Sequence, residues 1–127
     1  MNEASPATGD TVSISLFQLG RFRLASGVAS AWKIECDALT TEDWRTLAVI
    51  AVQRFGLRFG CVHGVPRGGV PFADALRPYA VYPGPTLVVD DVLTTGRSLF
   101  AERDRQGSPD ALLLVAFARG SVPVMLM

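Results

Sequence analysis

The stretch "TLVVDDVLTTGRS" (residues 86–98) decides the fold class of this 127-residue chain. Its first part, "TLVVD" (86–90), is a short and almost continuous apolar run, the pattern of a strand buried on both faces of a sheet. Two adjacent carboxylates, Asp90 and Asp91, come next, followed by a loop rich in Thr and Gly. Because two like charges beside a buried strand are unfavourable, we expect this pair to serve a ligand.

Strands and helices alternate along most of the chain. This alternation indicates an α/β fold, a Rossmann-like parallel sheet with flanking helices. Residues 13–27 contain short apolar alternation with Gly, which predicts strand pieces and turns. The sequence predicts helices over 39–56, 70–79 and 96–106, with the second ending before Pro78, and strands over 59–63, 80–82, 86–90, 111–118 and 122–127.

The helix over 39–56 has the clearest pattern. Thr40 or Thr41 can cap its N-terminus, and Gly56 is suited to close it. Its apolar residues recur at helical spacing and predict a buried stripe made of Trp44, Leu47, Ala48 and Ala51.

Composition narrows the functional classes. Twelve basic residues balance twelve acidic ones, and 49% of residues are hydrophobic. One domain with one core is expected over 12–127, with a flexible arm at 1–11. The charge balance argues against nucleic-acid binding.

Targeting signals are not evident in the sequence. The N-terminus is polar, and no apolar run is long enough for a membrane span, so we expect a cytoplasmic protein without a membrane partner. Cys36 and Cys61 lack a paired spacing and are expected to be reduced core residues. The single histidine, His63, is expected to be packed or hydrogen-bonded.

The loop after the acid pair has the composition of an anion cradle. Gly96 permits close backbone approach, and Thr94, Thr95 and Ser98 supply hydroxyl donors. The following helix points its N-terminus at the same place, so backbone amides and the helix dipole favour a phosphate. The neighbouring carboxylates suit sugar hydroxyls or a Mg²⁺ ion instead. Together they predict a site for a sugar phosphate.

A second glycine-rich loop, "GVPRGG" (64–69), follows the predicted strand 59–63. Arg67 lies between flexible neighbours there, and its planar fork of donors suits a second phosphate group. Alone, such a loop is no more than a turn. Beside the first loop, it predicts a second anion site.

Residues 86–98 resemble the signature of the type I phosphoribosyltransferases, which bind 5-phosphoribosyl-1-pyrophosphate (PRPP). The resemblance implies that fold, with a small N-terminal hood at 12–38, and implies Mg²⁺ bound with PRPP. It assigns Asp90 and Asp91 to the ribose hydroxyls, with Mg²⁺ as a further ligand. It assigns the 5′-phosphate to Thr94, Thr95, Gly96, Arg97 and Ser98, and the pyrophosphate to Arg67, Gly68 and Gly69. Asp90, Asp91 and Arg67 are thus the candidate catalytic residues.

Within that family, "FRLASGVAS" (22–30) is similar to the hood segment of the orotate phosphoribosyltransferases. The similarity implies a pyrimidine-like base held by Ser26, Gly27, Ser30 and Arg119. Purine-salvage members carry Asp at the position of Thr94, which argues against that branch. Relatives that dimerise with shared sites imply a homodimer.

One departure from the orotate branch bears on catalysis. That branch has a long cationic loop between its second and third core strands, whereas this chain has only "PGP" (83–85). The main expectation is an enzyme that transfers phosphoribosyl from PRPP to a pyrimidine-like base. The alternative is a non-catalytic PRPP- or nucleotide-binding regulatory or interaction module. Missing cations can otherwise come from Lys33, an Arg, or a partner subunit.

Overall fold

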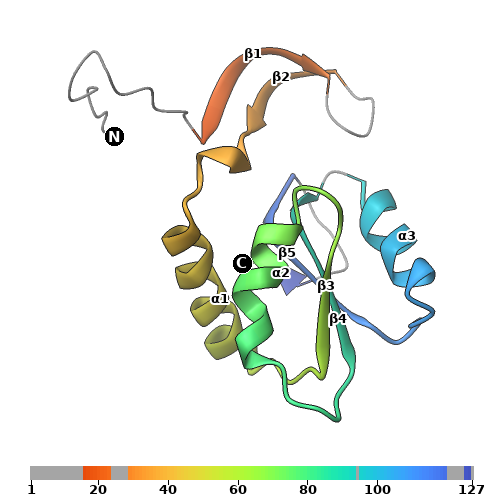
Figure 1. Ribbon diagram of the computed structural model, residues 1–127. Coiled ribbons are helices and arrows are strands. Elements are labelled where there is room, and N and C mark those ends of the chain that lie inside the picture. Colours follow the sequence, from red (N-terminus) through yellow and green to blue (C-terminus); the bar gives the residue numbers. More distant parts are fainter. Residues whose placement is uncertain (1–15, 24–28, 94, 120–124, 127) are drawn as a thin grey trace. The chain divides into compact units, whose positions relative to one another are not determined.

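The computed structural model describes residues 16–23, 29–93, 95–119 and 125–126. It divides the chain after Ala38 into two compact units, 1–38 and 39–127 (Figure 1). No helix in the described parts is long and apolar enough to cross a membrane.

The first unit contains an antiparallel strand pair. Strand β1 (Phe17–Arg23) pairs with β2 (Ala29–Ile34), and a short 3-10 turn (Cys36–Ala38) follows. The strand expected within 13–27 is thus present. Lys33 forms an ion pair with Glu35 at 2.9 Å, and this bond is the main cause that lowers the pKa of the Glu35 carboxyl.

The second unit is built on a parallel sheet of order β3-β4-β5-β6. Its strands are β3 (Cys61–Gly64), β4 (Thr86–Leu93), β5 (Leu112–Ala118) and β6 (Met125–Leu126). All neighbouring strands run in the same direction. The α/β fold with a parallel sheet is therefore confirmed.

Helices flank this sheet. Helix α1 (Thr41–Phe55) packs on α2 (Val70–Leu76), which continues as a 3-10 turn (Arg77–Tyr79), while α2 packs on β3 and β4. Helix α3 (Arg97–Arg105) packs against β4. Figure 1 shows α1 and α2 to one side of the strands and α3 to the other.

Strand β4 has helices against both of its faces. Leu87, Val88 and Val89 are fully buried in succession, which explains the continuous apolar run in the sequence. One core cluster combines Val88 and Leu93 of this strand with Val65, Leu99 and Val115 from neighbouring elements.

Helix α1 lies within the predicted range 39–56 and has caps that its sequence predicts. Thr40 is the N-cap: its hydroxyl accepts from the amide of Asp43 at 3.1 Å, and Asp43 accepts from the Thr40 amide at 2.8 Å. Gly56 closes the helix in the left-handed region, with φ of 57°. On the inner face, Trp44 is 4% exposed and its ring lies 5.3 Å from that of Phe72.

The strand expected over 80–82 is wrong. These residues form no ladder, and Val81 and Tyr82 are 71% and 88% exposed. Two backbone bonds hold the segment: the Ala80 amide donates to the Arg77 carbonyl at 3.1 Å, and the Val81 amide donates to the Phe59 carbonyl at 2.8 Å. The strand propensity of Val81 and Tyr82 does not make a strand without a partner strand.

Other boundaries shift as well. Strand β4 runs three residues past Asp90, because its pairing with β5 continues to Leu93. Cys36 is buried as expected, but Cys61 is exposed, so its assignment to the core is wrong. The cause is the position of Cys61 on β3, the edge strand of the described sheet, where Val62 is the residue that points inward.

We expect Thr40→Ala to lower the free energy of unfolding by about 1 kcal/mol, because it removes the capping box of α1. Urea denaturation measures the change. Thr41→Ala is the matched control, since Thr41 is already inside the helix and exposed. Equal losses in the two variants would contradict the assignment of Thr40 as the cap.

Candidate functional site

Two loops meet at the carboxyl ends of β3 and β4. Residue pairing places Gly64, the last residue of β3, opposite Val89 of β4. The next amide, that of Val65, donates to the Val89 carbonyl at 2.9 Å. The loop 65–69 therefore leaves β3 directly beside the acid pair, as the parallel sheet requires.

Glycine is required where this loop approaches β4. A Cβ on Gly69 would lie 2.6 Å from the Val89 carbonyl oxygen and 3.0 Å from the Cα of Asp90. A Cβ on Gly68 would collide with the Asp91 carboxylate. Both glycines that the sequence assigns to an anion site thus lie against the two acids, and any side chain there would push the loop away.

The same loop presents an arginine to solvent. It closes on itself through the Gly69 amide, which donates to the Val65 carbonyl at 2.8 Å, and the peptide bond between Pro66 and Arg67 is cis. Arg67 is exposed, and no described residue bonds its guanidinium. This fork of donors is therefore available to an anion.

The two acids differ in their surroundings. Asp90 is 8% exposed, and its Oδ1 accepts from the Asp91 amide at 2.8 Å. Asp91 is half-buried, and its Oδ1 accepts from the Val92 amide at 2.7 Å. Burial is the main cause that raises the pKa of Asp90 from 3.8 to about 8, and the hydrogen bond and charge of Asp91 add to it. Asp90 therefore holds a proton near neutral pH until a ligand compensates its charge.

The second loop leads from β4 into α3. Gly96 has φ of 85°, a conformation that favours glycine, and no described side chain caps the helix there. The Thr95 hydroxyl accepts from the Arg97 amide at 3.3 Å. Thr95, Arg97 and Ser98 are all exposed. The start of α3 thus offers amides, hydroxyls and one cation, while Thr94 lies outside the described residues.

Strand β5 brings a further arginine to this edge of the sheet. The Arg119 amide donates to the Leu93 carbonyl at 3.0 Å, so the ends of β4 and β5 adjoin. Ser30 lies in β2 of the first unit, opposite Phe22. Ser26 and Gly27 lie outside the described residues. Within the second unit, the structure therefore brings together the acid pair, the described residues of both loops and Arg119.

The connection from α2 to β4 lies at the other end of the sheet. The Gly60 amide donates to the Pro85 carbonyl at 2.8 Å, and Cys61 pairs with Thr86 at the amino ends of β3 and β4. Residues 80–85 contain no charged side chain. This segment is therefore distant from both loops and brings no cation to them.

Sequence reasoning missed one residue of the loop's framework. A Cβ on Gly64 would lie 2.5 Å from the carbonyl oxygen of Gly69, so this position also requires glycine. Gly64 is the first residue of "GVPRGG", but only its contact with Gly69 in the tertiary structure explains why this position requires glycine.

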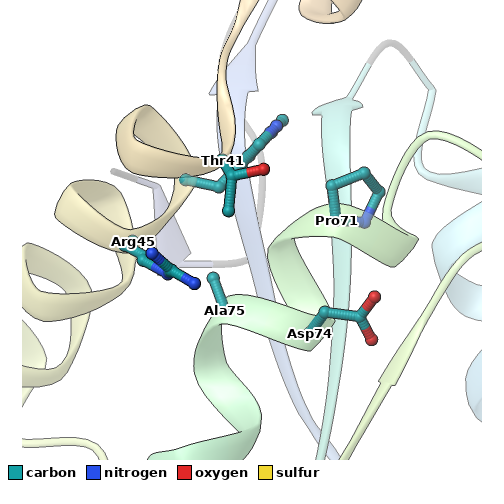
Figure 2. Close-up of a pocket in the computed structure, with 6 residues that line it drawn as sticks. Thr41, Arg45, Pro71, Asp74 and Ala75 are labelled. Carbon is teal, nitrogen blue, oxygen red and sulfur yellow. The ribbon is translucent and has the colours of Figure 1, made fainter.

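A surface cavity of about 260 Å³ lies away from these loops, between α1 and α2 (Figure 2). Arg45 and Asp74 line it, and Figure 2 shows the Asp74 carboxylate pointing away from Arg45. Each is bonded on its own helix, Arg45 to Glu42 at 2.7 Å and Asp74 to Arg77 at 3.3 Å. None of the candidate residues lines this cavity.

No group of three or more His, Cys, Asp or Glu side chains suited to hold a metal exists among the described residues. The carboxylates of Asp90 and Asp91 are oxygen ligands of the kind that Mg²⁺ prefers. They fit an ion that a phosphate ligand brings with it, rather than one held by the protein alone.

Solved structures share this fold. Orotate phosphoribosyltransferase from Aeropyrum pernix aligns with a TM-score of 0.68 and 25% identity, over 87% of this chain and 85% of that one. UMP synthase from Leishmania donovani aligns with a TM-score of 0.67 and 19% identity, over 82% of this chain and 29% of that one. Orotate phosphoribosyltransferase from Mycobacterium tuberculosis H37Rv, in complex with inorganic phosphate, aligns with a TM-score of 0.59 and 19% identity, over 80% and 75%.

No family model and no curated protein matches the chain by sequence. The structural similarity supports the type I phosphoribosyltransferase fold.

We expect Asp90→Asn to be more stable than the parent at pH 8, by about 1–3 kcal/mol. The raised pKa means that between about pH 4 and pH 8 the folded chain keeps a proton that the unfolded chain has lost. Stability therefore falls as pH rises through this window, and the neutral amide escapes that loss. Urea unfolding of the parent and the variant at pH 4 and at pH 8 measures the free energy of unfolding. The exposed Asp110→Asn is the control, and an equal gain there would contradict the role of burial.

Proposed function

We propose that the protein is a phosphoribosyltransferase that transfers phosphoribosyl from PRPP to a pyrimidine-like base, giving a nucleoside monophosphate and pyrophosphate. The observation that carries this proposal is the close approach of Gly68 and Gly69 to Asp90 and Asp91. This contact places the proposed anion-binding loop beside the acid pair that is proposed to bind the ribose hydroxyls. A ribose that carries two phosphate groups requires both features.

Each group has a distinct part in this proposal. Asp90 and Asp91 accept hydrogen bonds from the ribose hydroxyls, and the loop from Thr94 to Ser98 binds the 5′-phosphate. Arg67 and the loop at Gly68 and Gly69 bind the pyrophosphate, where negative charge develops as the bond to C1 breaks. The protein thus acts by positioning the reactants and stabilising charge.

Mg²⁺ is the proposed cofactor, with Asp90 and Asp91 as its nearest protein ligands. When bound, it neutralises charge on the leaving pyrophosphate. The base is assigned to Ser26, Gly27, Ser30 and Arg119. A homodimer is the proposed assembly, in which a second copy can supply cations.

A second candidate function is favoured by the uncharged segment 80–85. It lies at the amino ends of β3 and β4, so it neither covers the site nor supplies a cation there. A site without such a cover is open to water and lacks that stabilisation of the leaving group. This observation favours a non-catalytic module that binds PRPP or a nucleotide.

Two measurements on the full chain separate the candidates. Calorimetry with PRPP and Mg²⁺ is expected to show binding, and pyrophosphate release is then followed with orotate, uracil and other bases. Release with a pyrimidine supports the enzyme. Binding without release on any base supports the module. If neither PRPP nor a nucleoside monophosphate binds, both the enzyme and the binding module are ruled out.

We expect Asp91→Asn to weaken PRPP binding by about 10–100-fold, because a charge-assisted hydrogen bond to the ribose is lost. Calorimetry measures the change, and circular dichroism checks the fold. Asp110→Asn, an exposed acid on the loop before β5, is the matched control and should bind as the parent does. Unchanged affinity in Asp91→Asn would show that the acid pair does not hold the ribose.

A further inference from the structure

A second group of reactive side chains lies on β3, outside the site described above. Cys61 and His63 are two residues apart on one strand and so face the same side. The Cys61 Sγ lies 4.0 Å from the His63 Nε2 and 3.4 Å from the Oγ1 of Thr86 on β4. Cys61 is exposed and His63 is half-buried. This arrangement places a thiol, an imidazole and a hydroxyl together at the solvent-facing edge of the sheet.

The two cysteines of the chain contrast with each other. Both are free thiols, but Cys36 is 8% exposed whereas Cys61 is open to solvent. Access and a neighbouring base are the two conditions that make a thiol reactive. Cys61 meets both, and no other hydrogen-bond partner of the His63 ring exists among the described residues.

We propose that Cys61 is a modification site: a nucleophilic thiol that reacts with hydroperoxides and alkylating electrophiles, with His63 as its proton acceptor. The proposal is independent of ribose-phosphate binding. Cys61 is at the start of β3, three residues before Gly64, which is about 10 Å of strand.

The reaction with a hydroperoxide balances as follows. The neutral imidazole takes the thiol proton at Nε2, and the sulfur attacks the nearer peroxide oxygen. The O–O bond breaks, and the leaving oxygen takes the proton back from the imidazolium. The sulfur is oxidised to a sulfenic acid, and the hydroperoxide is reduced to water or an alcohol. With an alkylating agent, a carbon–sulfur bond forms and halide leaves.

Thr86 assists the sulfur in this arrangement. It pairs directly with Cys61 across the two strands, and its hydroxyl can donate to the thiolate as charge develops. Ser108, from the loop before β5, lies 3.4 Å from the Thr86 hydroxyl. Thr86 on β4 and Ser108 in the loop before β5 thus form a polar environment on one side of the sulfur.

The first test labels the folded, full-length protein with iodoacetamide and identifies the modified cysteine by peptide mass. We expect Cys61 to react at least about tenfold faster than Cys36. Cys36→Ser should leave the labelling rate unchanged, and Cys61→Ser should abolish the fast phase. In denaturant, where access is equal, the two rates should converge. Faster labelling of Cys36 in the folded chain would overturn the proposal.

The second test addresses His63. We expect His63→Ala to slow labelling of Cys61, and its reaction with hydrogen peroxide, by roughly tenfold, because the proton acceptor is lost. Imidazole added to the buffer should restore much of the rate in this variant and change the parent little. A purely structural role for His63 predicts no rescue. Parent-like rates in His63→Ala would contradict the assignment of the base.

Discussion

The close approach of the loop 65–69 to the end of β4 is the constraint on which the candidate site depends. The bond from the Val65 amide to the Val89 carbonyl continues the sheet by one residue past β3 and fixes where the loop begins. Gly69 then lies against Val89 and Asp90, and Gly68 against the Asp91 carboxylate. At Gly69 the contact is between backbone and backbone, so the loop 65–69 and Asp90 cannot move apart without disturbing this edge of the sheet.

This closeness has an energetic consequence. Asp90 is buried where an apolar side chain would serve the fold better, and this burial is the main cause that raises its pKa. Such a buried carboxyl costs stability, which is a common property of functional sites. The cost is confined to one residue, since the preceding three residues of β4 are fully buried and apolar.

The features that bear on ligand binding and the feature that bears on turnover lie at opposite ends of the sheet, although they are close in the sequence. Groups that suit a ribose phosphate lie at the carboxyl ends of β3 and β4, whereas the uncharged segment 80–85 lies at their amino ends. The features that favour binding are therefore structurally independent of the feature that bears on turnover. The Cys61 thiol lies at the amino end of β3 as well, three residues before Gly64.

The sequence by itself determined the α/β class, helix α1 and the presence of the two glycine-rich loops. Those predictions rest on local physics: a two-sided apolar run in β4, a capping Thr at position 40 or 41, and glycines where backbone must approach closely. Its predictions of a strand at 80–82 and of a buried Cys61 are wrong. Pairing and coverage are properties of neighbours distant in sequence, so only the tertiary structure decided them. The same reason applies to Gly68 and Gly69. The sequence predicts a glycine-rich loop there, but its contact with Asp90 and Asp91 exists only once β3 and β4 lie side by side in parallel.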